Sequence, residues 1–364
     1  MSSFAPGTLA PLAQVNGKVR SFANPAGAYR PACTVVICTR NRPELLDQCL
    51  AAVSKLEYGR FDILVADNAP SDDQAREIAA RWGARYVAEP IAGVSRARNR
   101  AARLCRSEIV AYLDDDAVPE PGWLAAVVRE FRDPQVMAVS GRILSLRVTT
   151  EGEKLFAAMG GFDHGEQRRV VDRQTPHWFE LANFGGLGDG NMTFRRRAFD
   201  CWPGFHLSLG RGAILALGEE HHAFFSLIAA GYRVVYTPQA IIRHPYPHTI
   251  EQIRARHLTQ AISSTAYLTL MFAEQPAYRL ATLKYALGAL LGQRRKWRYQ
   301  APLTMRAGPR LVSPWRTMLA CLCGPLQYVR SRFSPRFNQE ARPTVPATVM
   351  AAAPSPAPEN ALVS

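Results

Sequence analysis

The sequence has no run of apolar residues long enough to cross a membrane. Its longest apolar segments, at 261–273, 281–292 and 317–326, are shorter than the ~18 residues that a spanning helix needs. The N-terminus also lacks a basic stretch followed by a continuous apolar core, which a secretory signal has. These absences predict a chain that is neither inserted in a membrane nor secreted.

Cysteine is also sparse, and its spacing carries no metal signature. The chain has seven cysteines, an odd number, and none fits the spacing of a tetrahedral zinc site. The pair Cys321 and Cys323 is too isolated to form one. We therefore expect reduced cysteines in small apolar roles, and a cytoplasmic location.

The chain is long, and its basic charge is distributed unevenly. With 364 residues, 48% of them hydrophobic, it can bury one large core and carry appendages. The net charge is +14, and residues 251–342 hold 15 Lys and Arg against 3 Asp and Glu. Such a region suits anionic lipid, nucleic acid or a partner protein. No nucleic-acid reading module is recognisable, so nucleic acid is the least favoured.

Strand and helix patterns alternate through the first half of the chain. Parallel strands joined by right-handed crossovers and covered by helices on both faces are expected from this alternation. Because parallel strands end at one edge of a sheet, Thr39, Asp67 and Asp114 should lie close together. The predicted strands are Thr34–Cys38, Phe61–Ala66, Arg85–Ala88 and Ile109–Leu113.

The composition divides the chain into four parts. Residues 1–30 predict a flexible arm, and 343–364, rich in Ala, Pro and Val, predict a disordered tail. Residues 31–249 form the predicted α/β domain, in which the Gly-rich stretch 151–190 is expected to form loops. Residues 250–342 predict a helical, basic C-terminal region.

The most informative motif is Asp114-Asp115-Asp116, which directly follows the apolar strand. Three adjacent carboxylates raise one another's cost of ionising, and a divalent cation relieves the repulsion. Oxygen ligands suit Mg²⁺ or Mn²⁺, and ligands bind at the carboxyl ends of strands in open α/β sheets. The alternative is a solvated acidic turn before Pro119 and Pro121.

Three further features point to a nucleotide site, each with a simpler alternative. Asp67 can accept hydrogen bonds from a nucleobase or ribose, or it can form an Asx turn. Arg98 and Asn99, on a helix opened by a glycine turn, can reach phosphates and a base, or lie on a solvated basic face. Glu219 and Glu220 can act as a catalytic base and its partner, or simply favour a helix N-terminus.

These motifs together resemble family 2 glycosyltransferases of the GT-A fold. The resemblance runs from about Ala32 to His248, in the family's order and spacing. It is carried by Thr34-Val-Val-Ile-Cys-Thr-Arg-Asn-Arg-Pro, Val65-Ala-Asp-Asn, Gly93-Val-Ser-Arg-Ala-Arg-Asn, Ile109-Val-Ala-Tyr-Leu-Asp-Asp-Asp and Gly218-Glu-Glu. The family commonly has Glu-Asp where this chain has Glu219-Glu220.

The resemblance implies a Rossmann-like, mostly parallel sheet and a role for each matched residue. Thr39, Arg40, Asp67, Arg98 and Asn99 match donor-binding positions. Asp114 and Asp116 match the outer residues of the DxD motif. Asp115, which lies between them, is expected to belong to the donor-binding residues, as is Asp114. Asp116 and Asp114 would hold Mg²⁺ or Mn²⁺, with His244 as a further ligand. Glu220 aligns with the catalytic base and Glu219 with its partner.

The implied function is metal-dependent, inverting transfer of a sugar from a nucleotide-sugar, most often UDP-linked, to an acceptor hydroxyl. Cell-envelope glycan or glycolipid synthesis is the expected setting. Two alternatives stay open, a nucleotidyltransferase and a non-catalytic nucleotide-sugar-binding protein. Aromatic residues among the basic ones in Gln293–Tyr299, and Trp315 with Arg316, suit peripheral contact with the inner face of a membrane. Ordinary helices with a solvated basic face explain them equally well.

Overall fold

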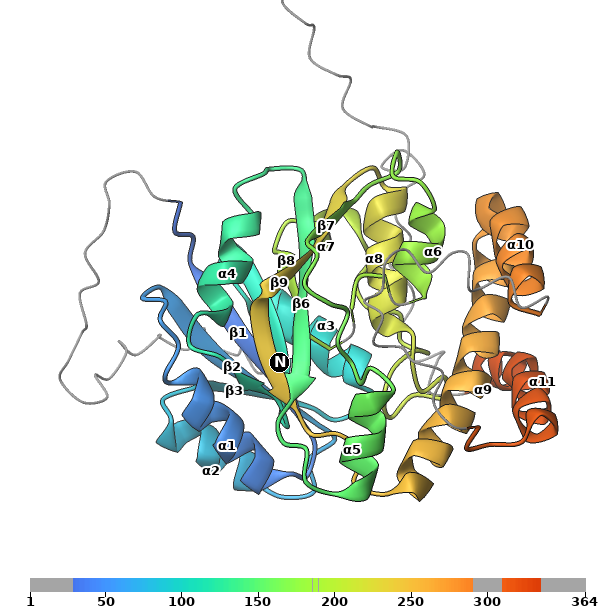
Figure 1. Ribbon diagram of the computed structural model, residues 1–364. Helices are drawn as coiled ribbons and strands as arrows, with labels where there is room; N and C mark the ends of the chain where they lie inside the picture. Colours follow the sequence, from blue (N-terminus) through green and yellow to red (C-terminus); the bar gives the residue numbers. More distant parts are fainter. Residues whose placement is uncertain (1–28, 185, 189, 291–309, 335–364) are drawn as a thin grey trace, which may run out of the picture.

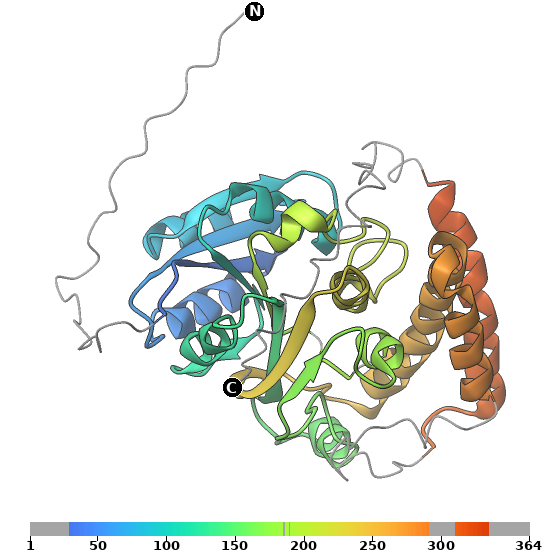
Figure 2. The same cartoon turned by 90° about the horizontal axis from the view of Figure 1, so that it is seen from above.

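A computed structural model describes residues 29–184, 186–188, 190–290 and 310–334. The arm predicted over residues 1–30 lies almost wholly outside these ranges, as do the basic segment Gln293–Tyr299 and the tail 343–364. The remaining elements form a mixed sheet with helices on both faces and a helical layer along one edge (Figures 1 and 2).

Strands and helices alternate in the first part of the chain, as the pattern predicts. The elements are β1 (Cys33–Thr39), α1 (Pro43–Val53), β2 (Phe61–Asn68), α2 (Gln74–Arg81), β3 (Arg85–Glu89), α3 (Val94–Leu104), β4 (Ile109–Asp114), β5 (Val118–Pro119), α4 (Trp123–Glu130) and β6 (Val136–Ser145).

The second part of the chain is more helical. Its elements are α5 (Glu151–Ala158), β7 (Arg169–Val171), α6 (Trp178–Asn183), β8 (Met192–Arg195), α7 (Ala198–Cys201), α8 (Glu219–Ala229), β9 (Arg233–His244), α9 (Ile250–Glu274), the short 3₁₀ helix η1 (Pro276–Tyr278), α10 (Arg279–Leu290) and α11 (Pro314–Arg332).

The strands of the described residues form one sheet in the order β3-β2-β1-β4-β8-β6-β9-β5, with β7 paired to β9. β1 runs parallel to β2 and β4, and β2 runs parallel to β3. β8 is antiparallel to both β4 and β6, while β6 and β9 are parallel. The α/β fold class predicted from the sequence is therefore confirmed, with the antiparallel strand β8 in the middle of the sheet.

Alternating side chains of β1 supply both cores of the molecule, because successive residues of a strand face opposite sides of a sheet. Val35 and Ile37 pack beneath α1, α2 and α4. Val36 and Cys38 pack on the other face, in the core that α3, α6 and α8 cover. Burial on both faces explains why the strand is continuously apolar.

Helices α9, α10 and α11 form the layer beside α6 and α8 (Figures 1 and 2). The Tyr267 hydroxyl of α9 donates to Asn183 Oδ1 of α6 over 2.5 Å, in the buried interior. α11 lies closely against α9 because Gly324 has no side chain; a Cβ there would stand 2.6 Å from the backbone nitrogen of Ala266. No helix of the described residues is both long and apolar enough to span a bilayer.

One local prediction was wrong. Residues 151–190 contain α5, β7 and α6 rather than loops alone, and α5 begins with a capping box of Thr150 and Glu153. In the turn before α1, Asn41 has a φ of 52° and its side chain accepts a hydrogen bond from the backbone nitrogen of Ser71.

Candidate active site

The ends of three neighbouring strands bring the predicted donor-side residues together. Thr39 at the end of β1 lies opposite Asp67 at the end of β2, and Cys38 lies opposite Asp114 at the end of β4. The Thr39 hydroxyl donates to Asp115 Oδ2 over 2.8 Å. This confirms that the polar residues at the strand ends share one edge of the sheet.

Asp67 is a buried residue, and one of its two carboxylate oxygens has no hydrogen-bond partner among the described residues. The Tyr86 hydroxyl donates to its Oδ2 over 2.9 Å, whereas Oδ1 has no hydrogen-bond partner among the described residues. Burial raises the pKa of Asp67, and the Tyr86 hydrogen bond opposes this only in part. A buried unpaired oxygen is costly unless a donor group meets it, so Asp67 has the property expected of a ligand contact.

Arg42 is a site residue that the sequence analysis did not single out. Its Nη1 lies 3.0 Å from Asp115 Oδ1 and 3.2 Å from Asp116 Oδ2. Burial raises the pKa of Asp115 to about 6, although Arg42 and Thr39 favour its ionised form. Both oxygens of Asp115 are thus engaged by protein groups, which suits a residue that fixes the turn. The only signal for Arg42 was its place in the same loop as Arg40.

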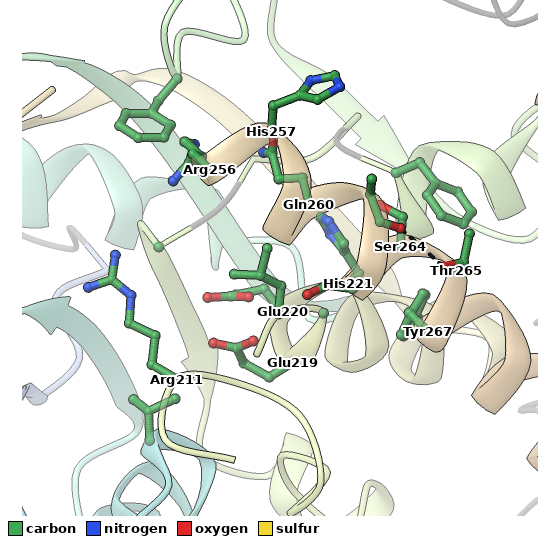
Figure 3. Close-up of a pocket in the computed structure, with 18 of the residues that line it drawn as sticks. Arg211, Glu219, Glu220, His221, Arg256, His257, Gln260, Ser264, Thr265 and Tyr267 are labelled. Atoms are coloured by element: carbon green, nitrogen blue, oxygen red, sulfur yellow. Dashed lines mark hydrogen bonds between the residues drawn. The ribbon is translucent and has the colours of Figure 1, made fainter. Parts of the chain in front are cut away.

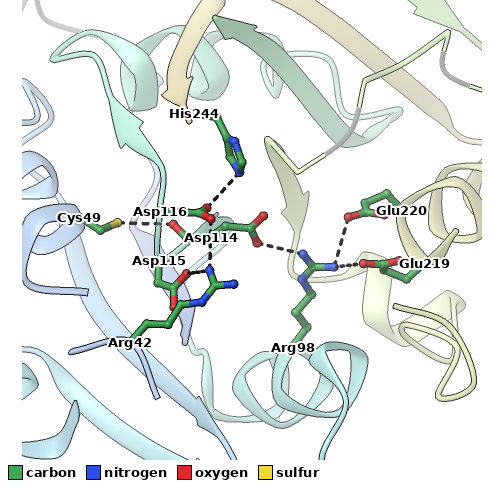
Figure 4. A network of polar contacts seen from close by, with 9 residues as sticks. All are labelled: Arg42, Cys49, Arg98, Asp114, Asp115, Asp116, Glu219, Glu220 and His244. Atoms are coloured by element: carbon green, nitrogen blue, oxygen red, sulfur yellow. Dashed lines mark hydrogen bonds and ion pairs between the residues drawn. The ribbon is translucent and has the colours of Figure 1, made fainter. Parts of the chain in front are cut away.

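Asp114, Asp116 and His244 converge on one point. Each offers a ligand atom, and these three atoms lie within 4.8 Å of one another. His244 Nε2 is 3.0 Å from Asp116 Oδ1, which brings the end of β9 onto the turn after β4 (Figure 4). Burial alone would raise the pKa of Asp116, but His244, Arg211 and Arg42 lower it to about 2. Two carboxylates and an imidazole form a suitable donor set for a divalent cation such as Mn²⁺.

Arg98 links this cluster to the two glutamates. Its guanidinium is buried and lies 3.3 Å from Asp114, 3.0 Å from Glu219 and 3.4 Å from Glu220 (Figure 4). Burial opposes the charge of Arg98, yet the surrounding carboxylates raise its pKa. The donor side and the glutamates therefore belong to one continuous polar network.

The two glutamates differ in their access to the cleft. Both stand in the first turn of α8, after Gly218, whose φ of 107° turns the chain into the helix. The Glu219 side chain is 5% exposed and that of Glu220 is 14% exposed. Burial, reinforced by the charge of Glu220, raises the pKa of Glu219. Glu220 is thus the carboxylate that a second substrate can reach, and Glu219 lies behind it.

We expect Arg98→Met to destabilise the protein by about 3–5 kcal/mol, because it leaves buried carboxylates without their cation. The loss should be larger near pH ~8 than near pH ~5. Glu219 has a raised pKa in the folded state, so the free energy of unfolding falls as the pH rises above the pKa that a glutamate has in the unfolded chain. Removing Arg98 raises the folded-state pKa of Glu219 further, which enlarges this loss. Urea unfolding at the two pH values measures this difference.

Arg100→Met is the matched control for this prediction. Arg100 lies on the same helix, is exposed, and approaches Glu89 only to 3.7 Å. Its replacement should change the stability by no more than about 0.5 kcal/mol at either pH. Equal, pH-independent effects of the two substitutions would contradict the network described here.

Asn99 contacts a distant loop, and its expected role in donor binding stays a prediction. Its Nδ2 donates to the carbonyl oxygen of Phe205 over 2.8 Å, and its Oδ1 accepts from the backbone of Phe205 over the same distance. Both ends of the amide are therefore used to hold a distant loop. No sequence pattern shows this contact, because its partner lies 106 positions further along the chain.

The start of α3 is fixed by Asn68 and faces two arginines. The Asn68 side chain accepts from Gly93 over 2.8 Å and donates to Ile91 over 2.9 Å, so β2 and α3 are tied together. Exposed Arg40 lies beside Gly212 next to this turn, and Arg211 lines the cleft nearby. Arg211 was also missed from the sequence; its only signal was a basic residue between two glycines.

A cleft of about 680 Å³ extends from the Asp114 edge across α8 to the C-terminal helices (Figure 3). Glu220 and His221 lie in its middle, and α9 forms the far wall. The residues of α9, α10 and α11 that line it include Arg256, His257, Gln260, Ser264, Tyr285, Thr317 and Cys321. The C-terminal region thus contributes directly to the cleft, which the sequence analysis did not predict.

Known proteins resemble this chain over its first two thirds. Residues 34–202 match the family model "Glycosyl transferase family 2". A pre-mycofactocin glycosyltransferase of Mycobacterium tuberculosis is 28% identical over 227 residues, which is 61% of this chain and 44% of that protein. The succinoglycan biosynthesis protein ExoM of Rhizobium meliloti is 26% identical over 232 residues, 58% of this chain and 66% of ExoM.

Among solved structures, a mannosyltransferase of Pyrobaculum calidifontis, in complex with GDP-Man and Mn²⁺, aligns with a TM-score of 0.49. It is 20% identical, and the alignment covers 84% of this chain and 88% of that one. The family match contains the strand ends and the Asp cluster, so this part of the chain is similar to glycosyltransferase family 2. The chain spans between about two fifths and two thirds of the length of the two curated relatives above.

Proposed function

We propose that this protein transfers a sugar from a nucleotide-sugar to an acceptor hydroxyl, with inversion at the anomeric carbon. The observation that carries the proposal is the network of Arg98. It joins Asp114, one of the three candidate metal ligands, to Glu220 in the cleft. A site that places a metal-binding edge next to an accessible carboxylate has both parts that such a transfer needs.

The donor half of the site has groups for the base and for the diphosphate of a nucleotide-sugar. Asp67 accepts the N–H of a base such as uracil, which favours a UDP-linked donor over an adenine nucleotide. Thr39 holds the turn through Asp115, and Arg40, Arg42 and Arg211 supply positive charge for the diphosphate.

Asp114, Asp116 and His244 fit a divalent cation, because their ligand atoms converge and their chemistry suits Mg²⁺ or Mn²⁺. When bound, such a cation neutralises charge on the leaving diphosphate. Arg42, which contacts Asp116, stands where it can exchange that carboxylate for a phosphate oxygen.

Glu220 acts as the general base. It takes the proton from the acceptor hydroxyl, whose oxygen attacks the anomeric carbon from the face opposite the leaving group. The bond from that carbon to the diphosphate breaks, and its electron pair leaves with the nucleoside diphosphate. Arg98 orients Glu220 through their 3.4 Å contact, and buried Glu219 shares the same cation. Geometry matters most here, because the base must lie within ~3 Å of the hydroxyl.

The acceptor half is the part of the cleft between α8 and α9, with His221, Arg256 and Gln260 on its walls. We propose a glycan or lipid-linked glycan of the cell envelope as the acceptor. No disulfide joins the described cysteines, which accords with a cytoplasmic location.

The test is a panel of nucleotide-sugars measured by thermal shift with and without Mn²⁺. A true donor at a hundredfold excess over its dissociation constant should stabilise the native state by about 2.7 kcal/mol. We expect stabilisation by a uridine diphosphate sugar that needs Mn²⁺, and none by adenine nucleotides. If no nucleotide-sugar shifts the melting temperature under either condition, the proposal is wrong.

A further inference from the structure

Helix α11 has its large apolar side chains on the outside of the molecule. Its inner face packs on α9 mainly through small residues, with Ala320, Gly324 and Ser331 buried together with Tyr328. On the opposite face lies an outer stripe, spaced at three or four residues and exposed over its whole length. The outer stripe consists of Trp315, Met318, Leu322, Leu326, Val329 and Phe333.

This arrangement is the reverse of what a helix at a protein surface normally shows. Apolar residues at helical spacing usually face the core, and monomeric proteins rarely expose large contiguous apolar patches. Leu322 is 63% exposed and Leu326 71% exposed. Neighbouring α10 repeats the feature on a smaller scale, with Leu280, Leu283 and Leu287 exposed at the same spacing. A surface of this kind marks a binding face.

The charges around the outer stripe restrict what can bind there. α10 and α11 contain five basic residues, Arg279, Lys284, Arg316, Arg330 and Arg332, and no Asp or Glu. Arg332 contacts Glu274 of α9, while Arg316 and Arg330 lie exposed along α11. An apolar stripe bordered by cations, without acidic groups, is complementary to a surface with an anionic rim over an apolar interior.

The same helices reach the far end of the cleft. Thr317 and Cys321 of α11 and Tyr285 of α10 line it, on the side of each helix away from the exposed leucines. Any surface that the outer stripe contacts is therefore one helix thickness from the proposed acceptor site. We infer that α10 and α11 dock the protein on an anionic lipid leaflet, with the outer stripe in the boundary between headgroups and acyl chains.

The test uses the full chain and sedimentation with vesicles. The protein should bind vesicles of phosphatidylcholine with phosphatidylglycerol, and bind pure phosphatidylcholine much more weakly. Leu322→Glu with Leu326→Glu should lower the partition coefficient at least about a hundredfold, since each buried leucine contributes about tenfold or more. Arg316→Gln with Arg330→Gln should remove most of the preference for anionic lipid and of its salt sensitivity.

The matched control is Leu104→Glu with Val148→Glu, which changes two exposed apolar residues outside the C-terminal layer. It should bind vesicles like the wild type. Circular dichroism checks that each variant is folded, and thermal shift with the nucleotide-sugar should be the same for all, because the outer stripe lies outside the donor site. Failure of donor binding alone would thus count against the proposed function and leave the lipid contact standing.

Two results would overturn the lipid contact. One is the absence of vesicle binding by the wild type, or equal binding by the leucine variant and the wild type. The other is a stable dimer in sedimentation velocity that the leucine substitutions dissociate while vesicle binding is unchanged. The outer stripe would then be an interface between two copies of the chain.

Discussion

Glu220→Gln is expected to abolish sugar transfer while leaving donor and metal binding intact. Glutamine has nearly the same shape and keeps a hydrogen bond to Arg98, but it cannot take a proton. General-base catalysis contributes about 10²–10⁴-fold, so the turnover number should fall by roughly that factor. The Michaelis constant for the donor should change little, because Glu220 lines the part of the cleft that we propose for the acceptor. Steady-state kinetics with labelled donor measure both.

Glu219→Gln separates the two carboxylates. Burial raises the pKa of Glu219, so the neutral amide resembles its protonated form, and the loss of turnover should be much smaller. If Glu219→Gln were inactive while Glu220→Gln still transferred sugar, the roles of the two residues would have to be exchanged.

Asp116→Asn is expected to remove the dependence of donor binding on Mn²⁺. Asp116 is held ionised by His244, Arg211 and Arg42, with a pKa of about 2, so it offers a full negative charge at neutral pH. The amide keeps the size of the side chain but is a poor ligand for a hard cation. Several kcal/mol of charge stabilisation should be lost, a fall of roughly a thousandfold in kcat/KM.

The binding readout is a thermal shift with nucleotide-sugar, with and without Mn²⁺. The Mn²⁺-dependent part should disappear in Asp116→Asn and persist in Asp73→Asn, which changes an exposed aspartate of the α2 N-terminus. Full metal-dependent stabilisation of Asp116→Asn would show that the cation binds elsewhere.

Much of the proposed donor-binding part of the site can be predicted from the sequence, because its residues directly follow strands that are recognisable from their own local pattern. The strand that ends at Asp114 is a continuous apolar run, and parallel strands place their ends on one edge whatever the length of the crossovers. Asp67 and Thr39 could therefore be placed together although 28 positions separate them. His244 was placed only through the family resemblance, and β9 brings it to the cluster.

The rest depends on contacts between distant segments. Nothing near Asn99 indicates that Phe205 will take both ends of its amide. The capping box at Thr150 and Glu153 was visible in the sequence, but the glycines around it favoured loops. For α11, helical spacing predicts an apolar stripe but not its direction. The small residues Ala320 and Gly324 determine which face of α11 is buried. They let the helix approach α9 closely, which leaves the leucines on the solvent-exposed face.

The most direct measurement is an anomalous difference map from crystals grown with Mn²⁺ and a uridine diphosphate sugar. The account predicts a single strong peak within direct coordination distance, roughly 2.0–2.6 Å, of oxygens of Asp116 or Asp114, with His244 and the diphosphate as further ligands. A bound nucleotide with no manganese between Asp114, Asp116 and His244, or a manganese peak outside the cleft, would contradict it.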